Sequence, residues 1–332
     1  MSLLAVRGLH VWFDLPHGGR LHAVQGVSFD LDEGERLGLV GESGCGKTTA
    51  LLALMGLLPP SAEVAGSVSI NGTDILAGGE DSMRPHRWTD VAMVFQGAMN
   101  ALNPVKTIGS QIVEPMEFHG TASGASAKET ARDLLQLVGI PASAATRYPH
   151  EFSGGMRQRA AIAMALACNP KVLLADEPTT ALDVMVQAQI LQLLESLTVD
   201  LGLALVLVTH DLPLVTQVCE RAVVMYAGRV AEAGPVDTLF HDPRHPYTRL
   251  LFDATPDLSG DVDVVSIPGA PPRLDRPIEG CPFEPRCDRA FDRCKVETPV
   301  LTPVARSHEA ACHLNDVEVA GQGGAPEAEG VR

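Results

Sequence analysis

The sequence lacks any apolar run that could cross a membrane. A spanning helix needs about 20 consecutive apolar residues, and the longest apolar stretches here, residues 203–208 and 222–227, have the length of buried strands. The first residues, MSLLAVRGLHVWF, also lack the basic start and the small-residue cleavage site of a secretion signal. These absences predict a chain that stays in the cytosol or attaches to a membrane through a protein partner.

Positive charge is scarce. The chain has 25 Lys and Arg against 41 Asp and Glu, a formal net charge of −16. Such an acidic balance argues against a nucleic-acid binder and against a basic surface adsorbed to anionic lipid. Internal repeats are absent as well, which predicts a single copy of the unit that the motifs below define.

The strongest motif is a glycine-rich loop at residues 41–48, Gly-Glu-Ser-Gly-Cys-Gly-Lys-Thr, which matches G-x-x-x-x-G-K-[ST]. An apolar strand over 37–40 precedes it and a helical run over 49–58 follows it, as this motif requires. Glycines let consecutive backbone N–H groups turn inward as an anion site, and the helix points its positive end there. Lys47 adds a charge for the outer phosphates and Thr48 a hydroxyl for Mg²⁺. The loop predicts a nucleoside triphosphate site.

Two acids follow a second apolar strand. Residues 171–175 lead into Asp176 and Glu177, and carboxylates at the end of a buried parallel strand lie where α/β sheets bind ligands. Asp176 suits the Mg²⁺ partner of the loop. Glu177 suits a general base that polarises water against the γ-phosphate.

A second glycine pair precedes the Ala-rich helix predicted over 160–168. Ser153, Gly154 and Gly155 combine an N-cap with free backbone N–H groups at a helix start, which is another anion site.

The apolar pattern predicts an α/β fold. Alternation over 3–13 and 21–32 indicates antiparallel strands, and a further strand is expected over 67–70. Short apolar strands at 91–95, 172–175 and 204–208 suit a parallel sheet, with a βαβ helix over 184–197. Residues 223–226 and 229–232 indicate closing strands, and 126–138 a helix that Gly139 ends. Beyond about residue 240 the sequence becomes rich in Pro, Arg and Cys.

Together these motifs resemble the ATP-binding-cassette (ABC) ATPase family over roughly residues 1–240. Residues 41–48 resemble its P-loop, and Ser153 to Gln158 its signature segment. Gln96 resembles the Q-loop glutamine, Asp183 the D-loop aspartate, and His210 the switch histidine. Phe13 aligns with the aromatic that stacks on adenine, with its neighbour Trp12 as an alternative. The resemblance implies a P-loop NTPase with a RecA-like core, an antiparallel β subdomain and a helical subdomain at about 97–165.

The resemblance also assigns site residues. Glu177 and His210 are the expected catalytic pair, and Thr48, Gln96 and Asp176 are the expected Mg²⁺ ligands. The remaining residues expected to bind nucleotide are Phe13, Gly41, Ser43, Gly44, Cys45, Gly46, Lys47, Thr49, Ser153, Gly154, Gly155, Gln158 and Asp183. The family pairs two cassettes head to tail, so ATP would lie between the P-loop of one and the signature segment of the other.

The region after residue 240 resembles the C-terminal part of the peptide/nickel importer ATPases. The resemblance rests on residues 245–251, HPYTRLL, on 267–272, IPGAPP, and on 280–287, GCPFEPRC; residues 101–104, ALNP, follow the same subfamily. Gly97 and Ala98 depart from the acid-Pro pair more often found there. We therefore expect a C-terminal extension over 241–314 and a disordered tail over 315–332, which lacks aromatic residues.

Four cysteines lie in this extension, Cys281, Cys287, Cys294 and Cys312. Their spacing lacks the close C-x2-C pairs of zinc fingers. Four thiolates in a loop-rich segment suit a [4Fe–4S] cluster or structural Zn²⁺, and free thiols are the third possibility. Because some members of the resembled subfamily carry an iron–sulfur cluster here, that is the expectation.

The sequence thus predicts an ATPase subunit at the cytoplasmic face of the membrane that energises peptide import. Its expected partners are two membrane permease subunits, an extracytoplasmic binding protein and a second ATPase subunit, either identical or a distinct paralogue. One alternative keeps the transporter and changes the cargo to nickel or another small solute. The other is a soluble ABC protein that binds ribosomes or DNA, against which the net charge argues.

Overall fold

A computed structural model describes residues 2–16, 18–97, 101–180, 182–254 and 267–316. In that part of the chain, the central sheet has the strand order β11-β12-β10-β9-β3-β8-β7-β6. The strands are β3 (Arg36–Val40), β6 (Val91–Val94), β7 (Val172–Asp176), β8 (Ala204–Thr209), β9 (Arg221–Tyr226), β10 (Arg229–Pro235), β11 (Thr302–Ala305) and β12 (His308–Ala310). Strands β9, β3, β8, β7 and β6 run parallel, and β10, β12 and β11 pair antiparallel.

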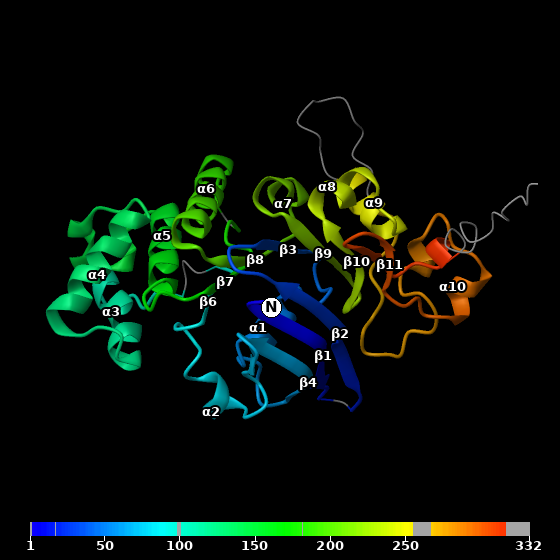
Figure 1. The fold of residues 1–332 in the computed structure, drawn as a ribbon, viewed down its shortest axis with the longest axis horizontal. Coiled ribbons are helices and arrows are strands. Elements are labelled where there is room, and N and C mark those ends of the chain that lie inside the picture. Colours follow the sequence, from blue (N-terminus) through cyan, green and yellow to red (C-terminus); the bar gives the residue numbers. More distant parts are fainter. Residues whose placement is uncertain (1, 17, 98–100, 181, 255–266, 317–332) are drawn as a thin grey trace, which may run out of the picture.

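The middle of this sheet is buried on both faces, which explains its unbroken apolar strands. Along β8, Leu205 and Leu207 join one hydrophobic cluster, while Val206 and Val208 join the other. The first cluster includes residues of α5 (Gly154–Ala165), α6 (Val184–Leu201) and α7 (Leu212–Val218). The second includes residues of α1 (Lys47–Leu54) and of a second sheet. Figure 1 shows α6 and α7 above the central sheet and the second sheet below it.

The second sheet is antiparallel, in the order β2-β1-β4-β5. Its strands are β1 (Leu4–Asp14), β2 (Arg20–Leu31), β4 (Ala62–Ile70) and β5 (Thr73–Asp74). The first two agree with the strands predicted over 3–13 and 21–32. Strand β4 begins five residues before its predicted start at residue 67, because its exposed first half carries no apolar alternation.

A helical region occupies one end of the molecule (Figure 1). It contains α3 (Ile108–His119), α4 (Gly124–Leu137) and α5, and a short α2 (Glu80–Met83) precedes it. Helix α5 corrects the predicted helix over 160–168: it begins directly after Ser153, whose hydroxyl accepts a hydrogen bond from the N–H of Met156. A Ser cap followed by two glycines therefore starts this helix, although glycine is a poor interior residue.

The C-terminal part joins the central sheet at its other end. After α8 (Val236–His241) and α9 (Pro246–Asp253), the chain forms α10 (Asp292–Val296) and then strand β12, which pairs with β10. Sequence patterns indicated only a loop-rich extension here. The tail predicted to be disordered over 315–332 begins within the described residues: Asn315 is buried and Asp316 pairs with Arg293, so these two residues belong to the folded part. The rest of the predicted tail, from residue 317 onward, lies outside the described residues. No helix in the described part of the chain is long and apolar enough to cross a membrane.

Glu232, on β10, connects the C-terminal part of the chain to the central sheet. Its carboxylate is fully buried, contacts Nε2 of His308 at 2.7 Å, and accepts hydrogen bonds from the backbone N–H groups of Arg244 and His245. The partners come from β12 and from the segment between α8 and α9. One side chain therefore ties two segments of the C-terminal part to β10.

We expect Glu232→Ala to lower the free energy of unfolding by about 3 kcal/mol, because it leaves buried donors without an acceptor. Urea denaturation followed by circular dichroism measures this effect. Glu309→Ala is the matched control, since Glu309 is exposed on the neighbouring strand β12. Equal unfolding midpoints for the two variants would contradict the assigned role of Glu232.

Candidate active site

The P-loop connects β3 to α1, and its glycines are needed for close packing. A Cβ on Gly41 would lie 2.2 Å from the carbonyl oxygen of Met225, and one on Gly46 would lie 2.5 Å from that of Ala23. Both residues also have positive φ, at 145° and 103°. The neighbouring backbone leaves no room for a side chain at these two positions, so only glycine permits this tight loop. Helix α1 then starts at Lys47.

Lys47, near the end of the P-loop, folds its buried side chain back into the loop. Its ammonium donates hydrogen bonds to the carbonyl oxygens of Gly41, at 2.7 Å, and Glu42, at 3.0 Å. The Cys45 sulfur lies 3.7 Å from the same nitrogen, and burial raises the pKa of that thiol. Cys45 therefore contributes a neutral packing side chain, while the ammonium charge is oriented toward the loop.

Parallel pairing brings the loop and the acid pair together. The Thr48 hydroxyl donates a hydrogen bond to Oδ1 of Asp176, the last residue of β7, at 3.1 Å. Asp176 is 1% exposed, and this burial raises the pKa of its carboxyl group above the usual range. A buried carboxylate that accepts a hydrogen bond from a single hydroxyl favours a nearby cation.

Glu177 is held by three side chains from three segments. Gln96 donates to Oε2 at 2.8 Å, Thr180 donates to the same oxygen at 2.9 Å, and Nδ1 of His210 lies 3.1 Å from Oε1. Its backbone has φ of 42°, a left-handed conformation that is uncommon for a non-glycine residue. Strain of this kind concentrates at functional sites, where surrounding contacts maintain it.

The same contacts keep Glu177 ionised. Burial acts to raise the pKa of its carboxyl group, but the hydrogen bonds from Thr180 and His210 outweigh it and lower the pKa below the usual value. A carboxylate that is ionised at neutral pH can accept a proton.

A cavity of about 410 Å³ opens beside the P-loop. Its lining includes the loop residues Ser43, Gly44, Gly46, Lys47, Thr48 and Thr49, and also Phe13, Leu21, Ala23, Gln96, Glu177, Pro272 and Leu274. Phe13 therefore borders the cavity. Trp12, the alternative aromatic, instead stacks on His22 with ring centroids 4.6 Å apart. Gly41 and Cys45, also predicted to bind nucleotide, do not line the cavity.

The signature residues lie elsewhere. Ser153, Gly154, Gly155, Gln158 and Asp183 are absent from the lining of this cavity. Ser153 is exposed and caps α5, and Asp183 is exposed and caps α6 through the N–H of Val186. Gln158 is 3% exposed. Within one chain, the structure therefore separates the P-loop half of the predicted site from the signature half.

Comparison with known proteins identifies this arrangement. A family model described as ABC transporter matches residues 24–180, and one described as the C-terminal region of oligopeptide/dipeptide transporters matches residues 231–294. The probable peptide ABC transporter ATP-binding protein y4tR of Sinorhizobium fredii is 46% identical over 316 residues, which cover 93% of this chain and 94% of the relative. The chain belongs to the ABC transporter family. It is an ABC ATPase, as the motifs predicted.

Two other relatives and a solved structure agree. The dipeptide transport ATP-binding protein DppD of Bacillus subtilis is 45% identical, with 95% of each chain covered. The oligopeptide transport ATP-binding protein OppD of Escherichia coli is 45% identical over 90% of this chain and 89% of its own. The ATP-binding cassette MJ0796, solved as a post-hydrolysis dimer with ADP and Pi, is similar with a TM-score of 0.63 at 30% identity, covering 70% of this chain and 98% of its own.

The four late cysteines of this ABC cassette come near one another without forming a metal site. Burial, together with the neighbouring thiols, raises the pKa of Cys281 and of Cys312 to about 11. Among the described residues, however, no group of three or more His, Cys, Asp or Glu could hold a metal ion. The residues as arranged do not fit the predicted [4Fe–4S] cluster or Zn²⁺, and the comparisons give no support for either.

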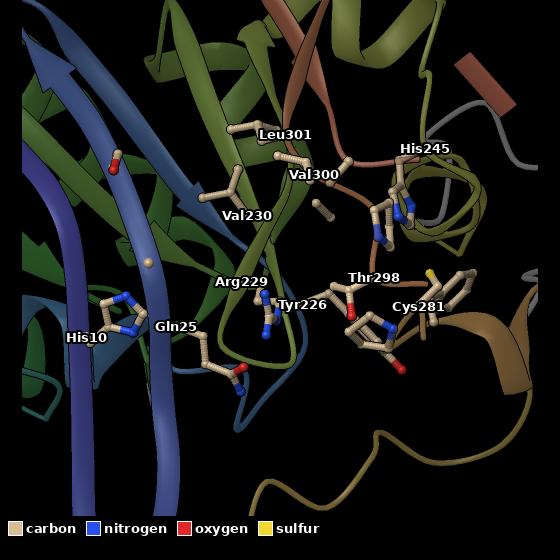
Figure 2. Close-up of a pocket in the computed structure, with 17 residues that line it drawn as sticks. His10, Gln25, Tyr226, Arg229, Val230, His245, Cys281, Thr298, Val300 and Leu301 are labelled. Carbon is tan, nitrogen blue, oxygen red and sulfur yellow. The ribbon is translucent and has the colours of Figure 1, made fainter. Parts of the chain in front are cut away.

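A separate cavity of about 500 Å³ lies between β2, the β9–β10 hairpin and the C-terminal chain (Figure 2). Its lining includes His10, Gln25, Arg229 and Cys281 but no residue of the P-loop. Although it is larger than the cavity at the P-loop, it lacks the backbone donors and carboxylates of a nucleotide site.

Several residues that line the nucleotide cavity or contact Glu177 were missing from the sequence predictions. Thr180 could have been suggested by its position three residues after Glu177, within reach of that carboxylate. Pro272 and Leu274 carried no signal, because they lie more than two hundred residues from the loop that they approach. Contacts of this range depend on the tertiary fold.

We expect Thr180→Val to shift the acidic limb of the ATPase pH profile to higher pH. The hydroxyl stabilises the charged form of Glu177, so its removal raises the pKa of that carboxyl group, and a base must be ionised to accept a proton. Steady-state phosphate release between pH 4 and 9 measures the shift. Thr216→Val is the control, since the Thr216 hydroxyl bonds only to the carbonyl of Pro213 among the described residues. Coinciding profiles would show that Thr180 does not tune Glu177.

Proposed function

We propose that this chain is the ATP-hydrolysing subunit that energises import of oligopeptides or dipeptides through a membrane ABC transporter. The observation that carries the proposal is Glu177, an ionised carboxylate held beside the P-loop cavity by Gln96, Thr180 and His210. The match to the oligopeptide/dipeptide C-terminal region and the relatives named for peptide transport support the cargo class.

In this proposal the P-loop binds the phosphates of ATP. Lys47 exchanges its bonds to the loop carbonyls for the outer phosphate oxygens, and α1 directs its positive end toward them. Phe13 stacks on adenine at the other end of the cavity. The exchange needs little movement, because the ammonium already lies inside the loop.

The residues present fit Mg²⁺. Thr48 and Asp176 already contact each other, and Gln96 lies at the same cavity. Mg²⁺ takes one or two protein oxygens and completes its shell with waters and phosphates, so a compact group of several acids is not required. When bound, the ion neutralises charge on the phosphate oxygens.

Hydrolysis is assigned to Glu177 and His210. The carboxylate accepts a proton from a water that attacks the γ-phosphorus, the bond to the β-phosphate oxygen breaks, and ADP and inorganic phosphate leave. His210 is 67% exposed at its side chain and bonds to Glu177, so it can reach the terminal phosphate while orienting the base.

The second half of the site is proposed to come from another cassette. Ser153, Gly154, Gly155, Gln158 and Asp183 would contact ATP bound to the partner's P-loop. The exposed start of α6 supports a contact here, because Val184 and Met185 are 79% and 72% exposed next to Asp183. A solved relative, MJ0796, is dimeric.

Further partners follow from the transporter role. Two permease subunits supply the membrane path, an extracytoplasmic protein delivers cargo, and this chain lies at the cytoplasmic face of the membrane. A cavity of about 530 Å³ beside α2 and α3, whose lining includes Trp88 and Phe118 and charged side chains of both signs, offers the permeases a contact. Co-purification of this chain with membrane subunits tests the transporter role against the alternative of a soluble ABC protein. Measuring whether the extracytoplasmic binding protein binds peptides or nickel tests the identity of the cargo.

A metal role for the four late cysteines stays a hypothesis outside this mechanism. It requires an arrangement of the thiols of Cys281, Cys287, Cys294 and Cys312 that the described part of the chain does not show. Iron and zinc analysis of protein purified without oxygen decides between a cluster, Zn²⁺ and free thiols.

We expect Glu177→Gln to lower steady-state ATPase in the assembled complex by roughly 100- to 10,000-fold, the usual contribution of a positioned base. Nucleotide binding should persist, because the amide keeps the shape of the side chain. Glu129→Gln, on the exposed surface of α4, is the matched control. Activity near wild type in Glu177→Gln would remove the general-base assignment.

We also expect Ser153→Arg to block ATP-dependent association of cassettes without weakening ATP binding to the isolated chain, since Ser153 does not line the P-loop cavity. The measurement is light scattering of the Glu177→Gln chain, with its partner cassette where one is required, in the presence of ATP and with or without Ser153→Arg. Ser123→Arg, at the exposed N-cap of α4, is the control. Loss of ATP affinity in the isolated Ser153→Arg chain would place the signature in its own site instead.

A further inference from the structure

The C-terminal chain reaches the nucleotide cavity at its apolar end. Pro272 and Leu274 line that cavity together with Phe13 and Leu21. The carbonyl oxygen of Leu274 accepts a hydrogen bond from the N–H of His22 at 3.2 Å, which holds the segment against β2. Strand β2, which pairs with the strand β1 that carries Phe13, thus has a chain from the far end of the sequence beside it.

The C-terminal chain also holds the P-loop. Arg286 makes a bidentate pair with Glu42, the second residue of the loop, through Nη1–Oε2 at 2.6 Å and Nη2–Oε1 at 2.9 Å. The Arg286 side chain is 4% exposed, and its Nε donates to the carbonyl of Pro268. Arg286 Nη1 donates also to the Tyr226 hydroxyl. In Figure 2, Tyr226 and Cys281 border the cavity where the C-terminal chain meets the core.

The backbone of Glu42 is held from both sides. Its N–H donates to the hydroxyl of Tyr247, at 2.8 Å, and its carbonyl oxygen accepts from Lys47 at 3.0 Å. Tyr247 is fully buried and packs against Tyr226 and Phe283, with ring centroids 4.5 Å and 5.3 Å away. The side chain, the N–H and the carbonyl group of Glu42 are therefore all hydrogen-bonded. The partners of the side chain and of the N–H, Arg286 and Tyr247, lie beyond position 240.

We propose that the C-terminal chain is a working part of the nucleotide site. Leu274 and Pro272 form the wall that faces the base of ATP across from Phe13, and Arg286 is a positioning residue that holds the P-loop through Glu42. The inference rests on the proposed function in taking ATP as the ligand of the P-loop cavity.

The physical reason lies in preorganisation. A phosphate site works when its donors are held in the bound geometry before the ligand arrives, so that ordering costs do not reduce affinity. A buried bidentate pair between Arg and a carboxylate fixes orientation better than a single hydrogen bond. Because Glu42 lies between Gly41 and Ser43, holding Glu42 in place also orients the backbone of these two neighbouring loop residues.

The test measures binding of Mg-ATP and of tripolyphosphate, which has no base, to the full chain. We expect Arg286→Gln and Glu42→Gln to weaken both ligands about 10-fold, equivalent to about 1.4 kcal/mol. Leu274→Ala should weaken ATP about fivefold through lost apolar contact and leave tripolyphosphate unchanged. Arg286→Lys should recover part of the affinity, since Lys keeps the charge without the bidentate fork.

Arg273→Ala is the matched control, because the Arg273 side chain is 74% exposed and pairs with Asp275 in the same segment. In steady-state ATPase, the Arg286 and Glu42 variants should raise KM for ATP and leave kcat near wild type, because Glu177 and His210 are untouched. Glu42→Gln changes the pair from the P-loop side and keeps the shape of the side chain, so the test does not depend on folding of the Arg286 variant.

Wild-type protein that binds no ATP would overturn the proposed function and this inference with it. Normal ATP binding by wild type, with Arg286→Gln and Glu42→Gln binding both ligands equally well, would overturn the inference alone. A fall in kcat at unchanged KM, or equal losses of ATP and tripolyphosphate in Leu274→Ala, would also contradict it.

Discussion

The parallel register of β3, β8 and β7 is the constraint on which the site depends. Val40 pairs with Thr209, and Asp176 pairs with Val208, so three strands end at one level of the sheet. The P-loop, the acid pair and His210 leave from those ends, and the contacts of Thr48 with Asp176 and of His210 with Glu177 follow. Backbone hydrogen bonds fix this alignment, and side-chain chemistry acts within it.

The C-terminal part is continuous with this core. Strand β12 extends the central sheet at β10, and Glu232 binds segments on either side of it. The same region supplies Tyr247 and Arg286 to Glu42, so loop and extension share one buried contact. The aromatic rings of Tyr226, Tyr247 and Phe283 pack together beside that contact and bury its Arg286 side, which strengthens the ion pair. A change in the extension therefore has a direct physical route to the phosphate site.

The residues of the predicted nucleotide site fall into two separate groups in this ABC ATPase. The P-loop, Asp176 and Glu177 converge on one cavity, whereas Ser153 and Asp183 cap helices that begin outside it. Exposed apolar residues at the start of α6 are typical of a surface that another protein covers. The separation supports the proposal that ATP joins two cassettes, since each provides what the other lacks.

The sequence by itself determined the local units. The P-loop spacing, the acids after an apolar strand and the Ser-Gly-Gly helix start specify short-range geometry, and these predicted the ABC ATPase family, which the comparisons confirmed. The apolar runs predicted most of the strands, but not β11, β12 or the first half of β4, because exposed or mixed strands lack that pattern. Only the tertiary structure placed Phe13 rather than Trp12 at the cavity and left the late thiols without a metal site among the described residues. It also brought Leu274 to the cavity and Arg286 to Glu42 of the P-loop. Contacts between residues hundreds of positions apart depend on how layers pack, which no local pattern of residues encodes.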